Sequence, residues 1–176
     1  MYSVNDPKTK YDLWVLQAGE SVPADRRPVP FLKTEFNELL GQISPDGGWM
    51  AYTSDESGQR EVYARTFPSA DSKTTISTAG GEQPRWRGDG KELFFVGVDG
   101  KMMAVAARVV AAAKPSFEPG VPVPLFDAHI APSLGNLVHQ YDVTADGKRF
   151  LVTTTAAGAS APPLTVVVNW TTGLKK

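Results

Sequence analysis

The sequence predicts an all-β protein built from repeated four-stranded antiparallel sheets. Three observations lead to this prediction. No window of the 176-residue chain shows sustained helical periodicity, and 16 glycines and 14 prolines divide it into short β-prone segments. An Asp-Gly pair flanked by alternating apolar and polar residues recurs three times. Each pair is followed within a few residues by a predicted strand bearing Trp49, Phe94 or Phe150.

The recurrent pair is expected to form a turn, because aspartate bonds to nearby backbone N–H groups and glycine adopts positive φ without steric cost. The three pairs are separated by 43 and 57 residues. The first spacing corresponds to the ~40–45 residues of a four-stranded propeller blade. The second is longer because of predicted loops at 111–124 and 131–138. The predicted turn residues are Asp46, Gly47, Asp89, Gly90, Asp146 and Gly147.

The first ten residues are polar, and we expect residues 1–10 to be disordered or extended. Residues 11–34 are predicted to form a half-blade of two outer strands, at 11–16 and 29–33. Pro28 and Pro30 identify the second of these as an edge strand.

Three further units follow. Blade 1 is predicted over 35–78, with strands at 40–44, 49–54, 61–67 and 73–78. Blade 2 is predicted over 79–130, with strands at 83–87, 92–98, 101–109 and 125–130. Pro115, Pro119 and Gly120 exclude a helix from its loop at 111–124. Blade 3 is predicted over 131–176, with strands at 140–144, 150–154 and 164–170 and its outer strand missing.

The segment Ser44-Pro45-Asp46-Gly47, with the alternating residues 48–54, resembles the TolB-type β-propeller repeat, a relative of the WD-type repeats. The second copy has Arg87 and the third has Thr144 where the first has Ser44. The end of the chain, from 141 to 170, is similar to the C-terminus of large bacterial proteins, some with an upstream serine/threonine kinase domain. The resemblance implies a repeat scaffold whose loops contact proteins or peptides, in the periplasm or outside the cell.

The number of predicted blades has a consequence for assembly. Closed propellers have four to eight blades, and about three blades leave open sheet edges. We therefore expect two chains to form a homodimer with a six-bladed ring. In that ring, the N-terminal half-blade of one chain would complete the third blade of the other.

Composition excludes several partners and sites. A net charge of -1 gives no electrostatic footprint for nucleic acid, and no apolar run approaches the ~20 residues of a membrane-inserted helix. The N-terminus has no signal-peptide apolar region, so the compartment stays open. The absence of cysteine excludes thiolate sites, and His129 and His139 lack metal-ligand spacing. We expect no cofactor and no metal.

The segment 80–87 is the strongest binding candidate, because it joins one blade to the innermost strand of the next. Arg85 and Arg87 alternate with Trp86, so their guanidinium groups share a face that suits a carboxylate or phosphate. Alternatively, they pair with acids such as Glu82 or Asp142. The equivalent segments 38–42 and 139–141 would line the same channel mouth. The candidate binding residues are Arg85, Arg87, Glu82, Gln42, His139 and Tyr141.

The sequence favours a non-catalytic interaction or scaffold module that binds a protein or peptide at the channel mouth. It has no G-x-S-x-G nucleophile elbow, and nothing favours a triad of Ser57, His129 and Asp127. A hydrolase is the alternative, either a propeller-associated peptidase or a glycosidase with two carboxylates about 5–10 Å apart. A third reading is a fragment of a larger protein without independent activity. The acids available for a glycosidase are Asp55, Glu56, Glu61, Glu82 and Asp142.

Overall fold

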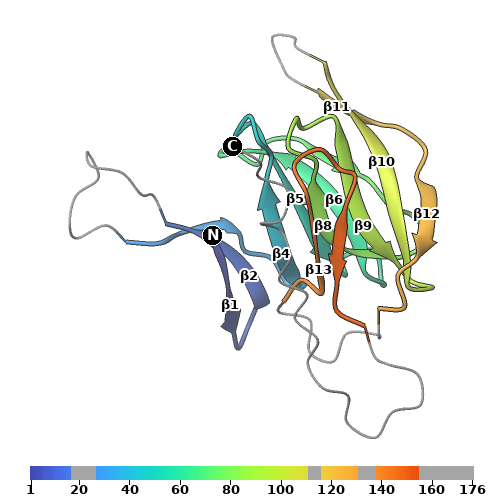
Figure 1. Cartoon of the computed structure of the whole chain (residues 1–176). Coiled ribbons are helices and arrows are strands. Elements are labelled where there is room, and N and C mark those ends of the chain that lie inside the picture. The colour runs from blue at the N-terminus through green and yellow to red at the C-terminus, as the bar shows by residue number, and fades with distance from the viewer. Residues whose placement is uncertain (17–26, 111–115, 131–137, 155–176) are drawn as a thin grey trace, which may run out of the picture.

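The structure, a computed structural model, describes residues 1–16, 27–110, 116–130 and 138–154 of the chain (Figure 1). These residues form strands and turns and contain no helix. The strands belong to four antiparallel sheets that follow one another in chain order. The all-β prediction is therefore confirmed. Within the described ranges, no helix is long and apolar enough to cross a membrane.

The N-terminal sheet has three strands in the order β1-β2-β3: β1 (Tyr2–Asp6), β2 (Lys10–Val15) and β3 (Val29–Leu32). The two predicted strands correspond to β2 and β3. The third strand was not predicted, because residues 2–6, expected to be disordered or extended, pair with β2. An ion pair of 2.6 Å between Lys33 Nζ and Asp6 Oδ2 joins the two ends of this sheet. Strand β3, which contains Pro30, lies at the edge.

Blade 1, as we name the second sheet, consists of β4 (Glu38–Ile43), β5 (Trp49–Ser54), β6 (Glu61–Thr66) and β7 (Lys73–Thr75). Its strands pair in chain order, as an antiparallel meander. All six residues of β5 are buried. A strand buried on both faces has a neighbour on either side, which places blade 1 between two other sheets.

Blade 2 contains β8 (Gly81–Trp86), β9 (Glu92–Gly97), β10 (Lys101–Val110) and β12 (Val123–Asp127). A short additional strand, β11 (Ser116–Pro119), pairs with the second half of β10. The prediction of a continuous loop over 111–124 was therefore wrong. Strand β11 forms because its Phe117, 4% exposed, packs against Trp49 and Trp86. The last strand also begins two residues earlier than predicted.

The third blade is described only in part. Strands β13 (Tyr141–Val143) and β14 (Phe150–Val152) form an antiparallel pair. The strand predicted at 164–170 lies outside the described residues. The prediction that this blade lacks its outer strand concerns the same part of the chain and stays a prediction.

Successive sheets pack face to face. Alternate residues of β5 contact opposite neighbours: Met50 and Tyr52 belong to the cluster with the N-terminal sheet, whereas Trp49 and Ala51 belong to the cluster with blade 2. Blade 2 packs in the same way, since its Phe94 faces β13 and β14. Four-stranded antiparallel meanders stacked in chain order have the architecture of propeller blades (Figure 1).

The three Asp-Gly turns share one backbone geometry. The residue two positions before each aspartate donates its backbone N–H to a carbonyl across the hairpin. Its own carbonyl accepts a bond from the glycine N–H. Each aspartate Oδ1 accepts a bond of 3.0–3.1 Å from the N–H two residues later. The φ angles of Gly47, Gly90 and Gly147 are 73°, 71° and 72°. The repeat is therefore visible in hydrogen bonds as well as in sequence.

The residue two positions before each aspartate also donates a side-chain bond to it. Ser44 and Thr144 do so with a hydroxyl group, and Arg87 does so with Nε at 2.7 Å. The bond from Arg87 lowers the pKa of Asp89 to about 2. Arg87 thus replaces the hydroxyl of the repeat pattern without loss of the bond.

A bulge recurs in the innermost strands of blades 1 and 2. Leu40 and Gln83 lie six residues before Asp46 and Asp89, and have φ angles of 54° and 61°. The strand register shifts at both places. A bulge bends its strand and redirects the side chains on either side of it.

Candidate functional site

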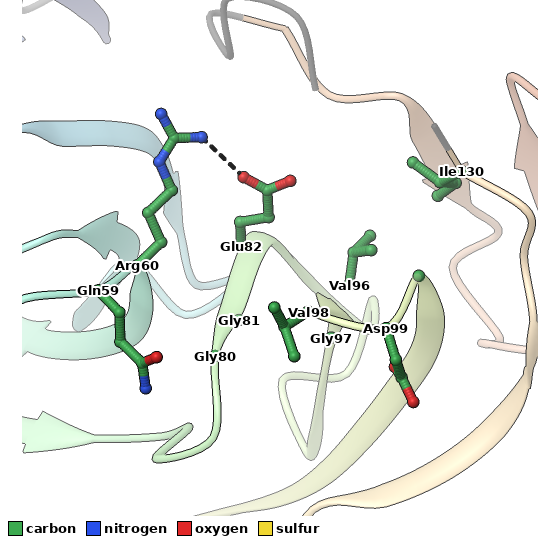
Figure 2. A pocket seen from close by; sticks show the side chains of 11 residues that line it. Gln59, Arg60, Gly80, Gly81, Glu82, Val96, Gly97, Val98, Asp99 and Ile130 are labelled. Atoms are coloured by element: carbon green, nitrogen blue, oxygen red, sulfur yellow. Dashed lines mark hydrogen bonds and ion pairs between the residues drawn. The ribbon is translucent and has the colours of Figure 1, made fainter. Parts of the chain in front are cut away.

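A cavity of about 500 Å³ opens where the chain passes from blade 1 into β8 (Figure 2). It lies at the end of the sheets opposite the Asp-Gly turns, because it borders the start of β8 and the end of β9. Its walls come from both blades and from the segment after β12. The lining residues used below are Arg60, Gly80, Gly81, Glu82, Val96 and Ile130.

Two glycines of the cavity lining lie in close contact with neighbouring residues. Gly80 has a φ of 89°, and a Cβ atom there would lie 2.8 Å from Val98 Cβ. A Cβ atom on Gly81 would lie 2.6 Å from Ser77 Oγ. Neither position accommodates a side chain without displacing its neighbour, so the backbone itself forms this wall.

The connection between the blades is anchored by Glu61, which is 2% exposed. Its carboxylate accepts bonds from Gly80 N at 2.9 Å, from Gln59 Nε2 at 2.7 Å and from the Ser77 hydroxyl. These bonds hold the strand-to-strand connection in place beside the cavity. Glu61 was one of the candidate acids for a glycosidase. In the structure, both of its carboxylate oxygens accept hydrogen bonds from this connection.

An ion pair crosses the cavity from one blade to the next. Arg60 Nη1 of blade 1 donates to Glu82 Oε2 of blade 2 at 3.0 Å (Figure 2). The two side chains are 39% and 19% exposed, so both reach solvent. Val96 and Ile130 lie on the other side of Glu82 and provide an apolar wall (Figure 2). The cavity thus combines a guanidinium group, a carboxylate and an apolar surface.

Of the six predicted binding residues, this cavity contains Glu82. Arg87 lies at the opposite end of β8, where its guanidinium bonds to Asp89 and, at 2.9 Å, to Glu92. Arg85 and Arg87 therefore do not form a joint anion site. The predicted alternative, pairing with acids such as Glu82 or Asp142, describes Arg85, which forms an ion pair of 3.7 Å with Asp142. Arg87 bonds instead to two acids of its own blade.

Arg85, His139 and Tyr141 lie together between the innermost strands β8 and β13. The nearest acid to Arg85 is Asp142, with 3.7 Å between Nε and Oδ1. His139 Nε2 donates to the Pro84 carbonyl at 3.2 Å. Burial and the positive charge of Arg85 lower the pKa of His139 to about 4, so the imidazole is neutral at pH 7.

The remaining predicted residues, Tyr141 and Gln42, form hydrogen bonds between strands that involve backbone carbonyl groups. The Tyr141 hydroxyl donates to the Gln83 carbonyl at 2.8 Å, and burial raises its pKa. Gln42 contributes its carbonyl, which accepts a bond of 3.1 Å from Trp86 Nε1. These contacts join blades and leave the Gln42 carbonyl and the Tyr141 hydroxyl occupied.

Sequence reasoning missed Gln83, which is fully buried at the bulge of β8. Its backbone N–H donates to Thr53 of blade 1 at 3.1 Å. Its side-chain amide accepts from Gln140 N at 2.6 Å and donates to Gln140 Oε1 at 3.0 Å. The shared position of the two glutamines, six residues before Asp89 and Asp146, is a signal that could have identified the pair.

The other candidate catalytic groups are held by neighbours. Asp55 accepts two bonds from Asn37, at 2.9 and 2.6 Å, and Glu56 pairs with Lys73 at 2.8 Å. The Ser57 hydroxyl donates to the Gln59 carbonyl, and His129 pairs with Asp127. Among the residues that the structure describes, no group of three acids or histidines is arranged to hold a metal.

Comparison with known proteins gives a structural likeness. No protein-family model matches the chain, and no curated protein sequence matches it. The chain is similar to the crystal structure of TolB from Acinetobacter baumannii, with 16% sequence identity and a TM-score of 0.49. The match covers 90% of this chain and 47% of that one, so the chain spans about half the length of the TolB structure. The likeness concerns the fold, and nothing in it supports an association with a kinase domain.

Proposed function

We propose that this chain is a non-catalytic interaction module that binds an extended segment of a protein or peptide at the cavity between blades 1 and 2. The observation that carries the proposal is the Arg60–Glu82 pair beside the apolar wall of Val96 and Ile130. A volume of about 500 Å³ is in the range of ligand-binding pockets.

The polar groups of the cavity suit a peptide backbone. A guanidinium has five N–H donors, and one nitrogen of Arg60 bonds to Glu82. The other donors can bond to peptide carbonyl groups, and the solvent-reaching Glu82 carboxylate can accept from a peptide N–H. An apolar side chain of the same peptide would lie against Val96 and Ile130. An extended segment presents all three kinds of group within a few residues.

A hydrolase receives less support from the described residues. Asp55, Glu56 and Glu61 each bond to a neighbouring group that fixes a turn or a connection. Glu82 alone among the considered acids lines the cavity. One carboxylate paired with an arginine matches recognition better than the two-acid chemistry of a glycosidase.

The proposal is tested by selecting peptides from a displayed random library on the immobilised protein. Affinity of a selected peptide is then measured by fluorescence anisotropy. We expect Glu82→Gln and Arg60→Gln each to weaken binding about tenfold, because each removes a charge-assisted hydrogen bond.

Arg108→Gln is the matched control, since Arg108 is 77% exposed and lies on β10 away from this cavity. It should bind the peptide like the wild-type protein. A library that yields no binder, or equal affinity of all four proteins, would refute the proposed site.

We also propose that two chains pair as a homodimer. Blades 1 and 2 are the two sheets of four or more strands among the described residues, and closed propellers have four to eight blades. Light scattering on a sizing column measures the mass in solution. A value near twice the 19.0 kDa of one chain is expected, and a monodisperse monomer would contradict pairing.

A further inference from the structure

The guanidinium group of Arg85 lies between two blades, where it forms an ion pair with Asp142 but no hydrogen bond with any described residue. Its side chain is 24% exposed, and its Nε atom is fully buried and has no hydrogen-bond partner. The 3.7 Å that separates Nε from Asp142 Oδ1 exceeds a hydrogen bond.

Other partly buried arginines of the described residues are bonded. Arg60 donates to Glu82, Arg65 donates to the Tyr52 hydroxyl and the Ala70 carbonyl, and Arg87 donates to Asp89 and Glu92. Arg85 is different because no acceptor among the described residues forms a hydrogen bond with its guanidinium, although the side chain is 24% exposed. A buried donor without a partner is costly, and an acceptor supplied by a ligand would remove that cost.

Among the described neighbours of Arg85, Asp142 is the acid that offsets its positive charge. His139 is neutral at pH 7, and its Nε2 is used by the Pro84 carbonyl. The Tyr141 hydroxyl donates to the Gln83 carbonyl, and the Gln83 side-chain amide bonds to Gln140. The Asp142 side chain is 65% exposed, so it can move into solvent when a better placed acceptor arrives.

We propose that Arg85 is the receptor for a carboxylate of the bound partner, supplied by an aspartate or glutamate side chain or by a C-terminus. A guanidinium binds a carboxylate through two parallel N–H···O bonds, a geometry that a distant Asp142 does not provide. The single charge of a carboxylate suits a site beside Asp142, which would repel a doubly charged phosphate more strongly. This inference rests on the proposed binding function and specifies the chemistry of its ligand.

A first experiment tests Arg85 without any peptide. The arginine Nε–H resonances of the ¹⁵N-labelled protein are followed by NMR during titration with sodium acetate. Sodium chloride at equal ionic strength is the control. The signal lost in Arg85→Gln identifies the residue. We expect a saturable shift of this signal with acetate, and an equal response to both salts would overturn the proposal.

A second experiment uses the peptides selected from the library. Each acidic peptide is compared with its Asn or Gln counterpart, and each free C-terminus with its amide. We expect one of these neutral replacements to weaken binding to the wild-type protein about tenfold, and to change nothing in Arg85→Gln. The replacement that matters identifies the source of the carboxylate.

The failures of the two proposals are distinguishable. Peptides that bind equally well with and without a carboxylate would overturn the role of Arg85 and leave the binding function intact. If no peptide binds, the proposed function fails, and the acetate titration still reports on Arg85. The Arg85→Lys variant keeps the charge but not the paired donors, so an affinity equal to that of the wild type would also overturn the proposal.

Discussion

Replacing Gln83 with alanine is expected to lower the free energy of unfolding by about 3 kcal/mol. The side chain is fully buried, and both of its polar atoms bond to Gln140 on the next blade. Its loss leaves the Gln140 N–H and side-chain carbonyl without these partners and creates a void at the point where three sheets meet. Urea unfolding followed by tryptophan fluorescence measures the change.

Gln83→Met separates hydrogen bonding from volume, because methionine fills nearly the same space without polar atoms. We expect it to be destabilised by about 2 kcal/mol. Glu35→Ala is the control for the loss of a polar side chain at an exposed position. Wild-type stability in Gln83→Met would show that the amide bonds do not join the blades.

Replacing Glu38 with glutamine is expected to remove a pH dependence of stability. Glu38 is 2% exposed, and its Oε2 atom is buried without a partner. Burial raises its pKa to about 7, an effect that the Thr34 hydroxyl bond opposes and the charge of Asp12 reinforces. The protonated carboxyl is therefore the form that suits the folded protein.

The sign follows from the direction of this shift. The folded pKa of about 7 is higher than the ordinary value of 4.5, so the stabilisation from the protonated form is complete below pH 4.5. It is lost as the pH rises towards 7, with a total of about 3 kcal/mol. Glu38→Gln should therefore be more stable than the wild-type protein at pH 8, and the advantage should shrink towards pH 4.5.

His139 contributes a slope of the opposite sign, because its folded pKa is lowered and its stabilisation is lost as the pH falls. The difference between Glu38→Gln and the wild-type protein is therefore the quantity to measure, since the histidine contribution cancels in it. Urea unfolding at several pH values between 4.5 and 8 gives this difference. A difference that does not vary with pH would contradict the assignment.

Local sequence predicted the strands of blade 1 and most of blade 2 because their alternation and turn residues agree. It failed for β1 and β11, where stability comes from distant partners. Strand β1 has few apolar residues and forms through pairing with β2. Strand β11 ends at Pro119, and its Phe117 is buried by tryptophans of two different sheets.

The same distinction applies to the candidate site. Glu82 was predicted from its place before an innermost strand. Arg60 was not predicted, because it comes from the preceding blade and meets Glu82 only after the sheets stack. Arg85 and Arg87 differ in their hydrogen bonds because Asp89 and Glu92 lie within a few residues of Arg87 and bond to it. The alternation of side chains along the strand does not indicate which of the two arginines these acids would bind.

The Asp-Gly turns touch one another from sheet to sheet. Gly88 N donates to the Ala145 carbonyl at 2.9 Å, and a Cβ atom on Gly88 would lie 2.8 Å from that residue. By contrast, the hairpin turn at 55–58 ends in Gly58, around which a Cβ atom would meet nothing within 4 Å. Protein engineers seeking new binders from this scaffold should therefore leave the Asp-Gly end unaltered. Randomised residues belong at the exposed Val98, which lines the cavity, and inserted residues belong at the hairpin tip between Ser57 and Gly58.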